Sequence, residues 1–184
     1  VDICDGRFVP AKTYASSGRR ASVVQIVSVA HKHKLLVELD LMIDLDCGDC
    51  MDHWVDALVA AKPHRVIFHL GSTYRWKELF ERLSAKHTSR TLPFEIGLAV
   101  RIDHTRREIA KVYNEHSFSS IQVMGIERVG KSGEKLSLKV YDRIKKIHRA
   151  YPDVVIAVDG GVKLDNAPQL FSAGAQKLGV NSGI

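Results

Sequence analysis

Asp159 is the residue of this chain whose surroundings most directly suggest chemistry. It ends the apolar run Val154–Val158 and is followed at once by Gly160 and Gly161. A carboxylate at the end of a buried strand is costly unless it is paired, hydrogen-bonded or bound to a metal. Two glycines let backbone N–H groups approach an anion closely. The segment therefore predicts either an acid beside an anion-binding turn or an aspartate that only caps that turn.

Two further aspartates lie near the N-terminus, on strands expected at 1–4 and 35–43. Asp2 belongs to the first strand, and Asp40 lies on the polar face of the second, opposite its apolar face. A lone buried carboxylate would be unfavourable there too. If the ends of these strands converge, Asp2, Asp40 and Asp159 predict a metal site, acid–base pairs, or both.

The elements that would position these acids are short apolar strands alternating with amphipathic helices. Strands are expected at 1–4, 35–43, 65–70, 94–100, 121–124, 154–158 and 177–180. Apolar residues at helical spacing occupy the intervals, and Thr105 with Glu108 forms a capping box. Trp54 and Trp76 belong to such helical stripes and are expected in the core. Regular alternation predicts parallel strands joined by right-handed crossovers.

Seven such units are one short of a closed barrel. We expect an α/β chain that forms a single, partial (β/α)₈ TIM-barrel domain over residues 1–184. The chain opens in mid-strand, so the first βα unit and the last helix are expected to be missing from it. The alternative is an open doubly wound sheet. No G-x-G-x-x-G follows a strand, which argues against the dinucleotide-binding version of that fold.

Composition excludes several classes of partner. The hydrophobic share of 45% and charged share of 26% are ordinary for a globular chain. The net charge of +6 comes from scattered basic residues, which argues against nucleic-acid binding. No apolar run approaches the ~20 residues that span a bilayer, so no membrane is expected.

Cysteine usage indicates a reducing, cytoplasmic setting. Three cysteines provide no disulfide framework. Cys47 and Cys50 form a C-x-x-C pair at a helix start, where the helix dipole favours thiolates. Ordinary surface cysteines are the favoured interpretation, and a redox pair is the alternative.

The motifs, taken in order, resemble the ribulose-phosphate 3-epimerase family. V-D-I-C-D-G-R-F-V-P at 1–10 is similar to the family's V-D-x-M-D-G-x-F-V-P, and V-D-G-G-V at 158–162 is equally specific. Weaker similarities keep the family's order and spacing between these two: E-L-D-L-M-I at 38–43, F-H-L at 68–70, G-L-A at 97–99 and V-M at 123–124. The resemblance covers essentially the whole chain and implies a barrel of the ribulose-phosphate-binding type.

What the resemblance implies is a metal-assisted 1,1-proton transfer at C3 of a ketose phosphate. D-ribulose 5-phosphate would become D-xylulose 5-phosphate through an enediolate, which a divalent cation stabilises. By position, Asp2 and Asp159 match the two acid–base residues. Asp2, Asp40 and Asp159 would hold one divalent ion of Zn, Mn, Fe or Mg.

The resemblance also implies a phosphate site and a substrate pocket. The phosphate would contact Gly160, Gly161, Asn181 and Ser182, beneath a loop that contains Gly130 and Gly133; Met42 and Met124 would line the pocket. The implied partner is a small phosphorylated sugar, with no nucleic acid or membrane, and a homo-oligomer is allowed.

Departures from the family fall on the site. Asp40 stands where the family has a histidine ligand, and an oxygen donor shifts preference from Zn²⁺ towards Mn²⁺, Fe²⁺ or Mg²⁺. The family's loop P-G-F-G-G-Q is replaced by R-V-G-K-S-G-E at 128–134, where Lys131 could add charge for the phosphate. His69 is expected to be a hydrogen-bonded core histidine rather than a direct ligand.

These departures leave two alternatives open. One is an epimerase for another ketose phosphate such as allulose 6-phosphate, and the other is a non-catalytic phosphosugar-binding barrel. A decarboxylase of the orotidine-phosphate type is disfavoured, because its D-x-K-x-x-D needs a lysine that is absent between Asp2 and Asp5.

Overall fold

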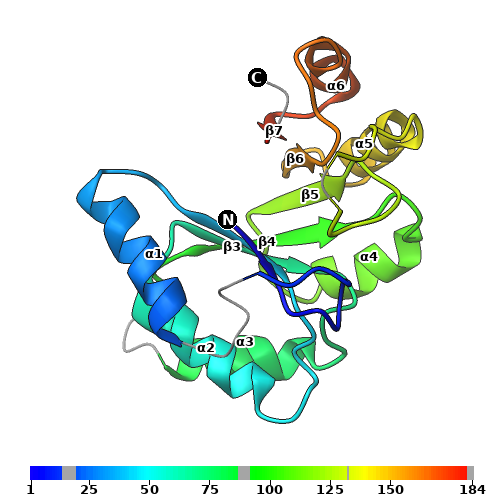
Figure 1. Ribbon diagram of the computed structural model, residues 1–184. Helices are drawn as coiled ribbons and strands as arrows, with labels where there is room; N and C mark the ends of the chain where they lie inside the picture. Colours follow the sequence, from blue (N-terminus) through cyan, green and yellow to red (C-terminus); the bar gives the residue numbers. More distant parts are fainter. Residues whose placement is uncertain (14–19, 87–91, 132, 182–184) are drawn as a thin grey trace. The chain divides into compact units, whose positions relative to one another are not determined.

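Strands and helices alternate along the whole described chain (Figure 1). The computed structural model describes residues 1–13, 20–86, 92–131 and 133–181. The strands are β1 (Asp2–Cys4), β2 (Glu38–Met42), β3 (Arg65–His69), β4 (Glu95–Val100), β5 (Ser120–Met124), β6 (Val155–Asp159) and β7 (Lys177–Gly179). The helices are α1 (Arg20–Lys32), α2 (Cys50–Ala61), α3 (Trp76–Ala85), α4 (Arg106–Tyr113), α5 (Lys139–Ala150) and α6 (Ala167–Ala173). Each expected strand is present, with one helix before the next.

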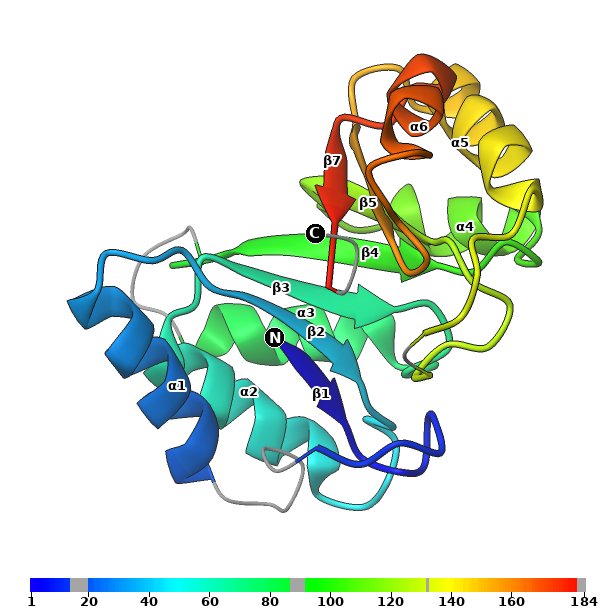
Figure 2. The same cartoon turned by 45° about the horizontal axis from the view of Figure 1, so that its top comes forward.

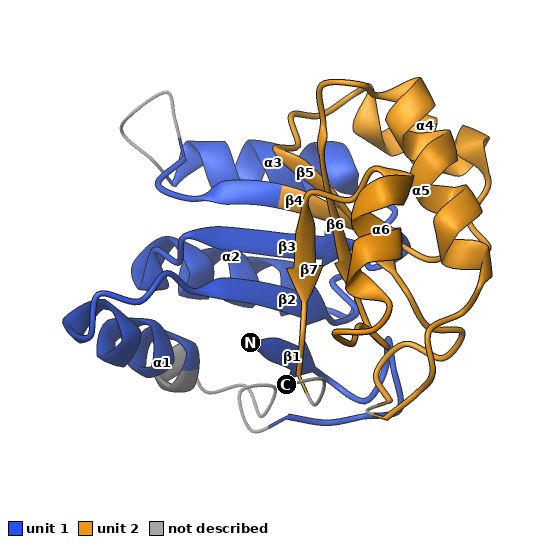
Figure 3. Ribbon diagram, turned by 90° about the horizontal axis from the view of Figure 1, so that it is seen from above, with its two compact units in different colours: residues 1–96 blue, residues 97–184 orange. Residues whose placement is uncertain are grey.

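The chain divides into two compact units, residues 1–96 and 97–184, with β4 beginning in the first and continuing in the second (Figure 3). In the first unit β1, β2 and β3 are parallel neighbours, and Asp2 aligns with Asp40. Helices α1, α2 and α3 cover one face of these strands (Figure 2). The core between them contains Leu39, Leu41 and Phe68, all fully buried.

The second unit repeats this construction. Its strands β4 to β7 are parallel neighbours in chain order, and α5 packs on β5 and β6 beside α6. Thr105 and Glu108 form the expected capping box of α4: Thr105 Oγ1 accepts from the Glu108 N–H, and Glu108 accepts from the Thr105 N–H. A parallel α/β fold is therefore confirmed. The single domain and the missing βα unit stay predictions.

Local chemistry explains where two elements begin and end. The N–H of Leu35 donates to the carbonyl of Ala30 at the end of α1 (2.9 Å), so β2 begins only at Glu38 rather than at Leu35. Helix α2 ends where Lys62 adopts a left-handed conformation (φ 53°) immediately before Pro63. Within the described residues, no helix is both long and apolar enough to cross a bilayer.

The cysteines differ from expectation. Cys47 and Cys50 form a disulfide, and Cys4 is the free, buried cysteine of the described chain. The interpretation of Cys47 and Cys50 as ordinary surface thiols is therefore wrong. The cause is a tight turn: the N–H of Cys50 donates to the Cys47 carbonyl (3.0 Å), and Gly48 between them has φ 51°.

A buried arginine joins the first residues of three strands. Arg65 at the start of β3 is 8% exposed; it donates through Nη1 to Glu38 of β2 (2.9 Å) and through Nε to Glu95 of β4 (2.9 Å). Removing the buried guanidinium would take the cation from the half-buried carboxylate of Glu38 and from the exposed carboxylate of Glu95.

We expect Arg65→Met to lower the free energy of unfolding by about 2 kcal/mol, measured by urea denaturation. Lys77→Met is the matched control, because the Lys77–Glu81 pair is exposed and its loss costs less than about 0.5 kcal/mol. Equal effects of the two substitutions would contradict a structural role for Arg65.

Candidate active site

A buried carboxylate–imidazole pair lies at the centre of the first unit. Asp40 of β2 is 5% exposed and His69 of β3 is 1% exposed, and Asp40 Oδ1 lies 2.6 Å from His69 Nε2. The pair joins neighbouring parallel strands, so the sheet register holds both side chains in place. His69 is a hydrogen-bonded core histidine, as expected.

Asp2 lies beside this pair, aligned with Asp40 across β1 and β2. Desolvation raises the pKa of Asp2, and the nearby charge of Asp40 raises it further. A carboxyl with a raised pKa is better suited to carry a proton near neutral pH than an ordinary surface aspartate.

The segment that follows β1 covers the pair. The carboxylate of Asp5 accepts hydrogen bonds from the N–H groups of Phe8 (2.9 Å) and Asp44 (2.8 Å), which ties this segment to the end of β2. The ring of Phe8 then packs edge-on against His69, with 5.4 Å between centroids. Asp5 is therefore a structural residue of the D-G-R-F motif, and Phe8 shields the Asp40–His69 pair.

In the second unit Asp159 ends β6 in a tightly fitted position. It aligns with Met124 of β5 and with Gly179 of β7. A Cβ at position 179 would lie 2.5 Å from Asp159 Oδ1, so any residue larger than glycine would require the carboxylate to shift. The N–H of Gly125 donates to the Asp159 carbonyl (2.6 Å). Sequence reasoning missed Gly179, although a glycine at the end of the strand after Asp159 was a usable signal.

Gly160 and Gly161 continue from Asp159 with φ of 92° and 71°, a region that favours glycine. The loop after β5 lies against them: a Cβ on Gly161 would meet the backbone N of Leu136 at 2.5 Å. Gly130 and Gly133 belong to this same loop, which an Arg128–Glu134 ion pair closes (2.6 Å). The end of this loop, at Lys135 and Leu136, therefore lies against Gly161, and a role for the loop in covering a phosphate stays a prediction.

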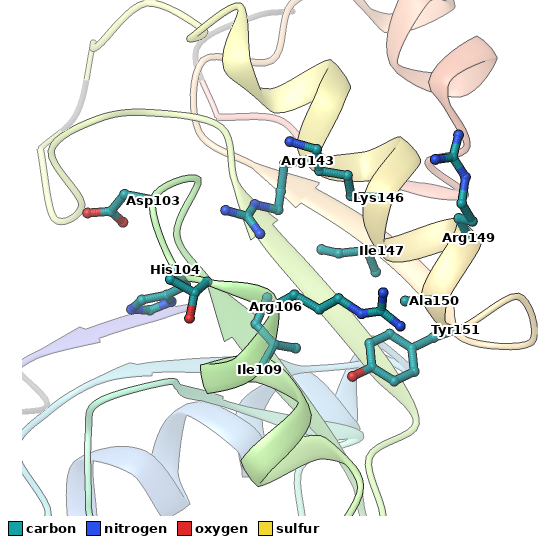
Figure 4. A pocket seen from close by; sticks show the side chains of 11 residues that line it. Asp103, His104, Arg106, Ile109, Arg143, Lys146, Ile147, Arg149, Ala150 and Tyr151 are labelled. Atoms are coloured by element: carbon teal, nitrogen blue, oxygen red, sulfur yellow. The ribbon is translucent and has the colours of Figure 1, made fainter.

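A basic pocket of about 440 Å³ lies elsewhere in the second unit (Figure 4). Arg106 projects from α4 and Arg143 from α5, and Lys146 and Arg149 add to its lining. Arg143 donates to the carbonyl of Ile102 (2.5 Å), and burial lowers its pKa. None of the predicted phosphate-binding residues lines this pocket, so it is separate from the predicted site.

The structure therefore groups the predicted residues within each unit. Asp2, Asp40 and the buried Met42 belong to the first; Asp159, Met124 and the glycines belong to the second, as does the exposed Asn181, while Ser182 lies outside the described residues. Across the parts of the chain that the structure describes, no three His, Cys, Asp or Glu side chains are gathered to hold a metal. A site formed by all three aspartates stays a prediction.

Comparison with known proteins identifies the relationship. The model of the "Ribulose-phosphate 3 epimerase family" matches residues 1–184. The chain belongs to the ribulose-phosphate 3-epimerase family. It is 26% identical over 186 residues to "Ribulose-phosphate 3-epimerase, cytoplasmic isoform" of Oryza sativa subsp. japonica, covering 100% of this chain and 73% of that relative. The predicted family is confirmed, and with it the enzyme class, carbohydrate epimerases.

Solved structures support the fold of this epimerase-family chain. A structure described as "Native KDPGal structure" has a TM-score of 0.57 at 17% identity, covering 91% of this chain and 66% of that one. A mutant tryptophan synthase alpha-subunit from Pyrococcus furiosus has a TM-score of 0.63 at 12% identity, covering 89% and 63%. The chain thus spans slightly less than two thirds of each of these two structures. At these identities the likeness concerns the fold alone.

The donors present in this family member fit a divalent cation by type. Asp2 and Asp40 supply carboxylate oxygens close enough for Asp40 to raise the pKa of Asp2. His69 adds an imidazole beside Asp40. This imidazole is engaged by Asp40, so the available donors are carboxylate oxygens, which suit Mg²⁺, Mn²⁺ and Fe²⁺.

The raised pKa of Asp2 predicts a pH-dependent stability difference for Asp2→Asn. Below pH 3.8, the ordinary pKa, Asp2 is protonated in the folded and unfolded states, so the variant and the parent differ little. As pH rises through the folded-state pKa, the parent loses stability relative to the variant. We expect Asp2→Asn to be more stable at pH 7 by up to about 1 kcal/mol.

Urea denaturation between pH 3.5 and 7.5 would measure this difference, with ~0.5-unit steps sufficient to follow one titration. Asp165→Asn, at an exposed position of the second unit, controls for the loss of one negative charge. A variant that is less stable than the parent at pH 7 would contradict the unfavourable environment assigned to Asp2.

Proposed function

We propose that this chain catalyses 3-epimerisation of a ketose phosphate, interconverting D-ribulose 5-phosphate and D-xylulose 5-phosphate. The observation that carries the proposal is the placement of Asp159, which ends β6 against a glycine that leaves space for its carboxylate. Family membership supplies the reaction class. The proposal takes the fold as a (β/α)₈ barrel, in which the carboxyl ends of the strands meet at one face.

In this mechanism Asp2 and Asp159 act as the two acid–base residues. One carboxylate removes the proton at C3, and the C–H electron pair moves into an enediolate. The other carboxyl returns a proton to the opposite face of C3, which inverts that centre. The raised pKa of Asp2 supports this role, because a carboxyl that binds its proton more tightly can both accept and return it.

Asp2, Asp40 and Asp159 would hold a divalent cation whose charge stabilises the enediolate oxygens. His69 orients the Asp40 carboxylate through its 2.6 Å contact, and buried partners of this kind tune a ligand's basicity. With Asp40 in place of the family histidine, the proposal favours Mn²⁺, Fe²⁺ or Mg²⁺ over Zn²⁺.

The substrate's phosphate is proposed to bind the backbone of Gly160 and Gly161, beside Asn181 and Ser182. The loop with Gly130 and Gly133 would cover it, and its backbone contact with Gly161 supports that placement. Met42 and Met124, both at least 97% buried, would line the sugar pocket. The proposed partner is a small phosphorylated sugar, with a cytoplasmic setting and association of copies allowed.

The decisive experiment is coupled turnover of D-ribulose 5-phosphate with and without added Mn²⁺, Fe²⁺, Mg²⁺ or Zn²⁺. We expect metal-dependent turnover, and Asp159→Asn should lower kcat by about 10²–10⁴-fold because one proton-transfer group is lost. Asp153→Asn, an exposed aspartate before β6, is the matched control and should retain parental kcat.

Two outcomes would redirect the proposal. Turnover of allulose 6-phosphate but not of D-ribulose 5-phosphate would keep the mechanism and change the substrate. A folded chain that binds a ketose phosphate but turns over none with any metal would replace the epimerase with a binding-only barrel.

Asp40→His tests the proposed metal preference, because it restores the family's nitrogen donor. Calorimetric titration should show the parent preferring Mn²⁺ or Fe²⁺, and the variant should gain at least about tenfold in Zn²⁺ affinity relative to Mn²⁺. Asp40→Asn controls for loss of the charge without a new nitrogen donor. An unchanged metal preference in Asp40→His would remove Asp40 from the proposed ligand set.

A further inference from the structure

The disulfide between Cys47 and Cys50 lies outside the machinery proposed above. Both cysteines are half-buried in the segment between β2 and α2, and the residues between them, Gly48 and Asp49, are exposed. They line an open pocket of about 480 Å³ together with Arg7, Lys12, Asp44, His53 and other residues of the first unit. A second thiol can therefore reach the bond from solvent.

We propose that Cys47 and Cys50 form a thiol–disulfide exchange site whose reaction partner is a dithiol. The proposal rests on the covalent pair and its accessibility, and it holds whether or not the chain is an epimerase.

The segment that carries the bond does not depend on it for its position. The N–H of Asp44 donates to Asp5 (2.8 Å), and the N–H of Leu45 donates to the carbonyl of Ser72 (2.8 Å). The carboxylate of Asp46 accepts from Thr73 Oγ1 (2.7 Å) and from the Tyr74 N–H (2.9 Å). A bridge across three positions also closes only a very short loop, where the entropic stabilisation is least.

Reduction of the Cys47–Cys50 bond is therefore expected to leave the fold unchanged. A disulfide that takes part in exchange must tolerate reduction in this way, whereas a purely stabilising disulfide need not. The anchoring hydrogen bonds involve no sulfur atom, so breaking the bond removes none of them. The tight turn keeps the two thiols close, which favours reoxidation.

The N-terminal end of helix α2 favours a thiolate on Cys50 over one on Cys47. Cys50 is the first residue of α2, and the preceding Asp49 makes no side-chain cap to the helix. The partial positive charge of this helix end lies near Cys50. Lys12 and Arg7 line the same pocket. Asp5, Asp44 and Asp49 also line this pocket, and their negative charges disfavour a thiolate. The helix end and the two basic residues partly offset that effect.

Cys4 provides the contrast within the same unit. It is 3% exposed, and desolvation together with the charges of Asp2, Asp40 and Asp5 raises its pKa to about 11. A buried thiol of this kind is inert towards exchange at neutral pH. The chain therefore carries its own unreactive reference cysteine.

The exchange reaction balances with a dithiol as the reductant. A thiolate of the dithiol attacks one sulfur of the Cys47–Cys50 bond, which breaks, and the other cysteine leaves as a thiolate. The second thiol of the partner, as its thiolate, then attacks the mixed disulfide. Two electrons and two protons pass to Cys47 and Cys50, and the partner is left as a disulfide.

The test uses the full chain purified without reductant, with dithiothreitol as the probe dithiol. The native protein is equilibrated in defined ratios of reduced and oxidised dithiothreitol, labelled with iodoacetamide and weighed by mass spectrometry. We expect two labels to appear together in one two-electron transition, on Cys47 and Cys50, with Cys4 unlabelled. Circular dichroism should show the same folded content in both states.

Cys4→Ser is the control variant and should leave the transition unchanged. Cys47→Ser isolates Cys50, and its thiol should react with a small aromatic disulfide at least about tenfold faster than Cys47 does in Cys50→Ser, because of the helix end. A bond that is reduced only after denaturation would overturn the proposal and make it a structural staple. So would three free thiols in the unreduced protein, a result that needs no variant to fold.

Discussion

The first unit is built around the need to compensate one buried charge. Asp40 lies in the middle strand of β1, β2 and β3, almost without solvent, and His69 Nε2 at 2.6 Å is the partner that makes this tolerable. Parallel register fixes the pair, since the two residues sit on neighbouring strands. Phe8 then packs against the imidazole, and Asp5 holds Phe8 in place. The opening V-D-I-C-D-G-R-F motif thus covers the Asp40–His69 pair through Phe8 and also supplies the carboxyl group of Asp2.

The same compensation leaves Asp2 in an unfavourable position. His69 contacts Asp40, and Asp2 faces the remaining negative charge with part of its hydration removed, so its pKa rises. Groups with a shifted pKa are common at functional sites, and Asp2 shares this property although its residue is exposed. In the second unit, the tight fit of Asp159 against Gly179 is a corresponding constraint. Both acids lie on parallel strands, whose register fixes the positions of their backbones.

Periodicity was sufficient to predict the parallel α/β alternation, because strands buried on both faces and amphipathic helices each have a distinct pattern. Trp54 and Trp76, assigned to helical stripes, are both 7% exposed. Pairing between strands was harder: the Asp40–His69 contact depends on register, which no local pattern encodes. The Cys47–Cys50 bond depends on turn dihedrals, with Gly48 at φ 51°, and spacing alone left it open. Leu35 was expected to begin the second strand, but its N–H donates to the Ala30 carbonyl at the end of α1, a detail that periodicity does not encode.

The residue type at position 40 affects both the packing of the sheet interior and the proposed metal site. A histidine there would face His69, placing two imidazoles in a buried site, whereas an aspartate gives His69 an acceptor at hydrogen-bond distance. Asp40 therefore gives His69 a partner in the sheet interior and at the same time places a carboxylate beside Asp2. The consequence for chemistry is a harder ligand set. A scaffold requirement, acting through the Asp40–His69 hydrogen bond, would be enough to account for the proposed metal preference without any change in the proposed acid–base residues.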